Sequence, residues 1–246
     1  PVTVTGGVVT TTAALAANTV YTLTVRAEET DNPLVFVEES ITIQTGSAGV
    51  DILNGDGFTD VIYALDGNDV VNGFGGNDTL FGQAGDDDLN GGSGSDNLTG
   101  GIGNDLVIGA AGNDTINYVI GDGFDTVDGG SGNDRLVLTS GGGNQTLAVT
   151  LDAAGVITTF QGGSVTSVES VTADLGGGTD TLSYTAPGGV TVDLVSGTAT
   201  GFTSIAGIEN VNTNGGSDTV TGVENSTPSL ARYWNASAPS NVPFGV

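Results

Sequence analysis

Apolar side chains recur at a fixed spacing through the middle of the chain. From Asp51 to Asp114 an aspartate occupies every ninth position, and an aliphatic residue follows each aspartate by two positions. These aliphatic residues are Leu53, Ile62, Val71, Leu80, Leu89, Leu98, Val107 and Ile116. One apolar side chain between two polar ones is typical of a short strand that buries one face. The spacing therefore predicts a series of short strands, each preceded by an aspartate.

The repeat continues beyond an insertion of two residues, through Asp125 with Val127 and Asp134 with Leu136. Ten units thus lie between residues 46 and 137. A flexible, low-complexity linker shares the Gly, Asn and Asp content, but it gives no reason to keep an aspartate and an aliphatic residue in phase. A period this regular indicates a stacked repeat architecture.

Each unit divides into a six-residue turn and a three-residue strand. Glycine, asparagine and aspartate suit tight turns because they tolerate positive φ. Two units make one coil of a flattened solenoid, in which parallel strands form two sheets and the aliphatic residues meet between them. One buried side chain for every nine ordered residues is a thin core. Stacking also brings carboxylates together, so we expect a bound cation to hold the turns.

The available ligands are carboxylate and carbonyl oxygens, which favour Ca²⁺ over Mg²⁺. Turns on one edge belong to alternate units, so each ion would lie between two aspartates of one stack. The two predicted stacks are Asp51, Asp69, Asp87, Asp105 and Asp125, and Asp60, Asp78, Asp96, Asp114 and Asp134. They have room for up to about eight ions. Residues 46–137 hold sixteen acidic residues and one arginine, a net charge of −15 that about eight divalent ions would balance.

The units Gly91-Gly-Ser-Gly-Ser-Asp96-Asn-Leu98-Thr and Gly100-Gly-Ile-Gly-Asn-Asp105-Leu-Val107-Ile resemble the repeats-in-toxin (RTX) calcium-binding nonapeptide. The resemblance implies an all-β fold, a right-handed parallel β-roll that folds on extracellular calcium. It also implies bacterial origin, type I secretion, and the sixth-position aspartates with turn carbonyls as ligands. The second and third units depart from the pattern at Phe58, Ala64 and Leu65, and the inserted unit before Asp125 also departs from it.

The second half of the chain contains a looser repeat with a period of about 40 residues. We expect residues 138–222 to form degenerate RTX-like solenoid coils. Asp180 and Asp218 are weaker candidates for metal ligands, and a turn aspartate that binds its own backbone is an equal alternative. Glu169 and Glu209 are candidate carboxylates for hydrolysis by number only, because no cleft-forming segment surrounds them.

The two ends of the chain have different patterns from the repeats. Residues 1–45 alternate apolar and polar positions and resemble the closing strands of an immunoglobulin-like or cadherin-like sandwich. Three interpretations follow. The upstream strands of such a sandwich are missing from this chain, or the hairpin segment caps the roll, or it completes the sheet of another chain. Residues 223–246 break the repeat, and we interpret them as a terminal cap, with part of a secretion signal as the alternative.

Composition excludes most catalytic chemistry. The chain has no His, Cys, Lys or Met, so it offers no imidazole base, thiolate or Schiff-base amine. The net charge of −26 excludes the basic surface that nucleic acids require. No run of about 18 apolar residues is present, so we expect no membrane insertion. The sequence therefore predicts a protein that is not an enzyme.

Two functions are consistent with these features. The first is a calcium-binding structural protein on the bacterial cell surface, an S-layer or adhesin component, secreted and then made rigid by calcium. The outward-facing Tyr63 and Phe81, with Val61 beside them, favour self-association or contact with other surface components. The alternative is the C-terminal module of a secreted enzyme whose catalytic domain is absent from this chain.

Overall fold

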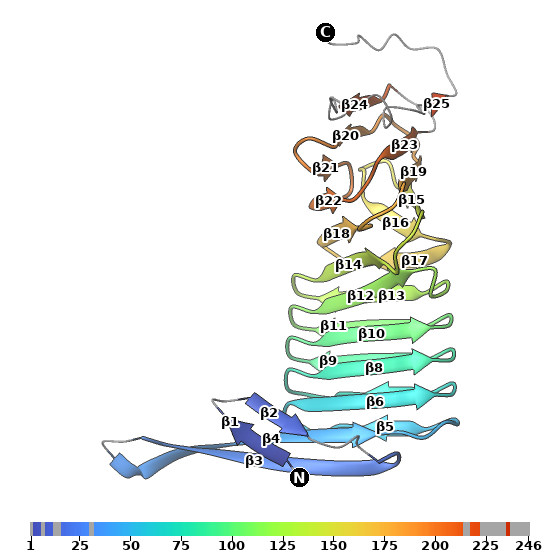
Figure 1. The fold of residues 1–246 in the computed structure, drawn as a ribbon. Helices are drawn as coiled ribbons and strands as arrows, with labels where there is room; N and C mark the ends of the chain where they lie inside the picture. The colour runs from blue at the N-terminus through green and yellow to red at the C-terminus, as the bar shows by residue number, and fades with distance from the viewer. Residues whose placement is uncertain are drawn as a thin grey trace.

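The chain folds into strands stacked in a column (Figure 1). The computed structural model describes residues 2–5, 8–11, 16–29, 32–213, 217–221 and 235–236. All regular elements in these ranges are strands. The all-β class predicted from the repeat is therefore confirmed.

One sheet contains nine strands, in the spatial order β22-β18-β14-β12-β10-β8-β6-β4-β3. In chain order these strands are β3 (Thr19–Glu29), β4 (Asn32–Thr45), β6 (Asp60–Asp66), β8 (Thr79–Ala84), β10 (Asn97–Ile102), β12 (Thr115–Ile120), β14 (Arg135–Ser140), β18 (Ser170–Asp174) and β22 (Ser204–Ala206).

The second sheet contains eleven strands, in the order β25-β23-β19-β15-β16-β17-β13-β11-β9-β7-β5. They are β5 (Ile52–Asn54), β7 (Val70–Asn72), β9 (Asp88–Ser93), β11 (Leu106–Ala111), β13 (Thr126–Ser131), β15 (Thr146–Leu151), β16 (Ile157–Phe160), β17 (Gly163–Thr166), β19 (Thr181–Thr185), β23 (Asn210–Thr213) and β25 (Asn235–Ala236). The smaller sheets contain β1 (Val2–Thr5) with β2 (Val8–Thr11), and β20 (Thr191–Asp193) with β21 (Thr198–Ala199) and β24 (Thr219–Thr221).

From β5 to β14, consecutive strands alternate between the two large sheets and pair in parallel with the strand two places along the chain. Leu98 of β10, for example, lies beside Leu80 of β8, eighteen residues earlier. This register follows directly from one strand and one turn per nonapeptide, two of which complete a coil. The predicted parallel β-roll is confirmed, while its right-handed sense stays a prediction.

The core of the roll is a double column of aliphatic side chains. Along each strand the burial alternates, so the middle residue of each predicted strand points between the sheets. From Ile62 to Leu136 these side chains are almost completely inaccessible to solvent, and Leu53, in the first strand of the roll, is slightly more exposed. Each rung adds one such residue per sheet. Hydrophobic burial in the roll is therefore limited to a narrow line.

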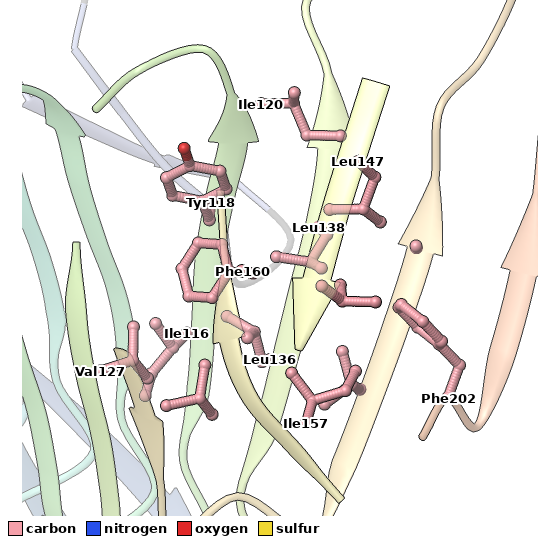
Figure 2. Packing of buried hydrophobic residues seen from close by; sticks show 14 of the residues in the cluster. Ile116, Tyr118, Ile120, Val127, Leu136, Leu138, Leu147, Ile157, Phe160 and Phe202 are labelled. Atoms are coloured by element: carbon pink, nitrogen blue, oxygen red, sulfur yellow. The ribbon is translucent and has the colours of Figure 1, made fainter. Parts of the chain in front are cut away.

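The core contains more buried side chains per strand beyond residue 118, and Figure 2 shows part of this cluster. Tyr118 packs edge-to-face on Phe160, with ring centroids 4.5 Å apart, and its hydroxyl donates a 2.7 Å hydrogen bond to the Gly123 carbonyl. Leu138 and Leu147 are fully buried in the same cluster. The expected degenerate coils of residues 138–222 include an antiparallel meander here, because β16 pairs antiparallel with both β15 and β17. This meander supplies the additional apolar side chains.

The N-terminal hairpin is continuous with the nine-stranded sheet. β3 and β4 are antiparallel from Thr19 and Thr45 to Glu29 and Asn32, and the end of β4 pairs in parallel with β6. The sandwich-like character of residues 1–45 stays a prediction. The predicted cap or tail at 223–246 lies outside the described residues, except for the short strand β25, which pairs with β23.

Most turns of the roll contain two residues with positive φ, four and two positions before the aspartate. Four residues before the aspartate, Gly92, Gly101 and Gly130 have φ of 101°, 115° and 95°. At the same position Phe74 and Ala110 have φ of 70° and 75°. A side chain in this region costs about 1–2 kcal/mol relative to glycine. These turns therefore carry local strain that the consensus glycine avoids.

We predict that Ala110→Gly stabilises the calcium-loaded protein. Removing the Cβ from a left-handed residue is expected to raise the free energy of unfolding by about 1 kcal/mol. The matched control is Ala111→Gly, one residue further in the same strand, where φ is ordinary and the loss should be about 0.5 kcal/mol. Urea denaturation in saturating calcium measures both. A lower stability for Ala110→Gly would contradict the assignment of strain.

Candidate metal centre

The ten predicted aspartates lie where the strands of the roll begin, in two stacks at opposite edges. Each stands directly before or at the first residue of its strand, because the preceding glycine-rich turn reverses the chain. Nine of the ten are buried, with exposed fractions of 3% or less, and Asp51 is half-buried. The structure therefore brings the predicted residues together as two ladders of buried carboxylates.

Hydrogen bonds connect successive aspartates within each ladder. The backbone N–H of one aspartate donates to Oδ1 of the aspartate in the next coil, as from Asp78 to Asp96 at 2.8 Å. Eight such bonds, of 2.8 to 3.0 Å, join the pairs expected from the spacing. The insertion before Asp125 does not break the ladder, since Asp105 donates to Asp125 at 3.0 Å. One carboxylate oxygen of each acceptor is thus occupied by the backbone.

The other carboxylate oxygen has no partner in most of these residues. A buried oxygen without a hydrogen bond occurs in Asp60, Asp69, Asp78, Asp87, Asp96, Asp105, Asp114, Asp134 and Asp180. Burying an ionised carboxylate in this state is strongly unfavourable unless a cation compensates its charge. Asp51 is different, because the amide and hydroxyl of Ser47 both donate to its Oδ2. The ladder therefore leaves a row of oxygen atoms available to cations.

A glycine five residues before the aspartate opens the space around the unpartnered oxygen. A methyl group on Gly73 would overlap both Asp78 Oδ2 and the carbonyl oxygen of Gly91 in the next coil. The same arrangement recurs at Gly82 and Gly109. Carboxylate and carbonyl oxygens thus approach one point in successive coils. This all-oxygen donor set fits Ca²⁺, which takes six to eight oxygen ligands.

Backbone carbonyls must provide much of this coordination. Among the described residues, no group of three His, Cys, Asp or Glu side chains is placed to hold a metal ion. Two aspartates from adjacent coils would therefore bind each ion together with turn carbonyls. When bound, calcium would supply positive charge to the ladder and so remove the repulsion between stacked carboxylates.

Burial changes the acidity of the ladder. It raises the pKa of Asp78, Asp87 and Asp125 to about 7, and that of Asp105 and Asp114 to about 6. Desolvation of the charged form is the main cause, and neighbouring aspartates add to it. The hydrogen bond from the preceding backbone N–H lowers the pKa and opposes this shift.

The acidic residues of the second region also lie in ladder positions. Asp180 Oδ1 accepts a bond from the Gln145 N–H in the coil before, and Asp218 Oδ1 accepts one from Val190 N–H. The described contacts therefore place both aspartates between coils rather than on their own turn backbone. Glu169 and Glu209 accept bonds in the same way from Asp134 and Asp180. The sequence analysis considered these two glutamates only as carboxylates for hydrolysis and missed their place in the ladder, although each precedes a buried valine by two positions.

Parallel strands stacked in two sheets, with a carboxylate ladder at each edge, define a β-roll of the cation-binding kind. The family model of the RTX calcium-binding nonapeptide repeat matches the chain in four copies, at residues 45–80, 54–89, 81–116 and 121–144. Residues 45–116 and 121–144 therefore contain calcium-binding RTX nonapeptide repeats. No curated protein and no solved structure matches it. Within the described residues no helix is long and apolar enough to cross a membrane.

We predict that Asp96→Asn reduces the number of bound calcium ions without breaking the hydrogen bonds of the ladder. The amide oxygen can still accept the Asp78 N–H, but the charged ligand shared by two turn pairs is lost. The expected result is a loss of about two bound ions per chain, one for each pair that Asp96 serves. Equilibrium dialysis of the saturated protein measures this number. Asp88→Asn, an exposed neighbour outside the ladder, is the matched control and should bind as many ions as the parent.

We also predict that calcium affinity falls as the pH decreases from 8 to 5. Protons compete for the carboxylates whose pKa values burial raises to about 6 or 7. Without calcium, pH has the opposite effect on the free energy of unfolding. The folded chain binds protons more tightly than the unfolded chain, so the stability that these protons contribute is lost as the pH rises through 7. Titrations against a chelator of known affinity test the first effect. An affinity that does not change down to pH 5 would contradict it.

Proposed function

We propose that the chain is a calcium-folded structural module of a secreted bacterial surface protein, of the S-layer or adhesin type. In this function, calcium met outside the cell converts a flexible, strongly acidic chain into a rigid column. The observation that carries the proposal is the row of buried carboxylate oxygens without partners. A chain with this ladder has a strong reason to stay unfolded until divalent ions are present.

The shape of the roll supports a structural role. Successive strands within one sheet are separated by about 4.8 Å, so each coil adds length rather than thickness. Figure 1 shows the strands stacked as rungs from the N-terminal hairpin to the last described strands. Repeat proteins of this kind bury each unit against its neighbours only, which makes an extended spacer.

An outward-facing aromatic pair supports a role in assembly. Tyr63 of β6 and Phe81 of β8 are neighbours in register, and their rings stack in parallel with centroids 4.9 Å apart. Both side chains are partly exposed on the outer face of the nine-stranded sheet. Stacked aromatic residues provide a flat apolar surface at low entropic cost. This pair is the surface through which we expect the module to contact another copy or another surface component.

We predict that β-structure appears steeply in a calcium titration, when roughly eight ions bind per chain. Cooperativity is expected because each internal aspartate serves two adjacent ions. Far-UV circular dichroism follows the folding, while small-angle scattering of the same samples follows the change from an expanded coil to a narrow rod. Magnesium at the same concentration is the control for charge screening. A chain that is already folded in chelator, or that stays expanded in calcium, would overturn the proposal.

A further inference from the structure

The carboxylate ladder continues beyond the last nonapeptide aspartate. β14 pairs in parallel with β18, and Arg135 lies opposite Ser170, so Glu169 stands where the aspartate of the next coil would stand. The N–H of Asp134 donates a 2.7 Å hydrogen bond to Glu169 Oε2. The two residues are 35 positions apart instead of the usual eighteen. The longer connection therefore keeps the ladder bond but uses a side chain with one more methylene.

Asp134 retains an unpartnered oxygen that faces this turn. Its Oδ2 is buried without a hydrogen bond, and the residue is only 1% exposed. Each described aspartate with such an oxygen donates its backbone N–H to a carboxylate of the next coil. Asp125 provides the contrast: Gly163 occupies the position of that carboxylate in the next coil, and neither oxygen of Asp125 is left unpartnered and buried.

The backbone around Asp134 has the same form as in the nonapeptide sites. A methyl group on Gly129 would lie 2.9 Å from Asp134 Oδ2 and would overlap the carbonyl oxygen of Ser167. At Gly109, one coil earlier, the corresponding atoms are Asp114 Oδ2 and the carbonyl oxygen of Gly129. A serine carbonyl thus takes the place of the glycine carbonyl, although Ser167 has a left-handed φ of 52° and Gly129 has no positive φ.

We infer that Asp134 and Glu169 form an additional divalent-cation site, at the junction between the nonapeptide block and the second region. Carboxylate oxygens of Asp134 and Glu169 and the Ser167 carbonyl are hard ligands of the type that calcium takes. The inference rests on the proposed calcium binding of the ladder. Asp180 and Glu209 show the same ladder bond, but Leu175 occupies the position of the glycine. We therefore make the inference for the first pair only.

The test compares bound calcium in the full chain and in Glu169→Gln. Glutamine can still accept the Asp134 N–H, so the variant should fold while losing the charged ligand. We expect it to bind one ion fewer per chain at saturation, measured by equilibrium dialysis with atomic emission, at unchanged circular dichroism. Asp88→Asn removes the same charge from an exposed position outside the ladder and should bind as many ions as the parent.

The outcomes separate this inference from the proposed function. If the parent chain binds no calcium, both fail. If the parent chain binds calcium and Glu169→Gln binds the same number of ions, only the additional site is overturned. Should Glu169→Gln lose its β-structure, the count is made on Glu169→Asp, which keeps the charge but withdraws the carboxylate by one methylene. One ion fewer in that variant supports the site, and an unchanged number overturns it.

Discussion

The structure depends on carboxylates that are buried with one oxygen bound to the backbone and the other oxygen unpartnered. The bond to the backbone fixes the register of each coil, because the N–H of one aspartate can reach only the aspartate stacked on it. The unpartnered oxygen makes that register costly until a cation is present. One residue type thus sets both the geometry of the roll and the condition under which it is stable.

The chain is stabilised by different means along its length. Through the nonapeptide block each rung contributes one aliphatic side chain per sheet, so hydrophobic burial is small and the turns must be held by ions. Beyond residue 118 aromatic residues such as Tyr118 and Phe160 enter a wider cluster, where hydrophobic burial per residue is larger. The carboxylate ladder becomes sparse in the same region. The nonapeptide block therefore has a dense ladder and a thin apolar core, whereas the region beyond it has a sparse ladder and a wide apolar core.

The sequence predicted the roll and its ladder well, because both follow from a period that never changes between Asp51 and Asp114. It predicted the second region less well for physical reasons. The antiparallel meander around β16 depends on long-range contacts of Phe160, which no local pattern shows. Glu169 was missed as a ladder residue because it is a glutamate instead of an aspartate and lies 35 positions after Asp134, where the repeat places the next aspartate at eighteen. The one available signal was that Glu169 precedes the aliphatic Val171 by two positions, as each ladder aspartate precedes its own aliphatic residue.

The strands at the N-terminal end of the column determine which backbone groups are open there. A stack of parallel strands presents open backbone groups at its end, and another stack could add to them in register. Here the direction of the chain reverses between β4 and β3, so the outermost described strand of that sheet runs against all its parallel neighbours. In the other sheet the last strand, β5, has only three residues. These two edge strands therefore offer another parallel stack a poor template at this end of the column.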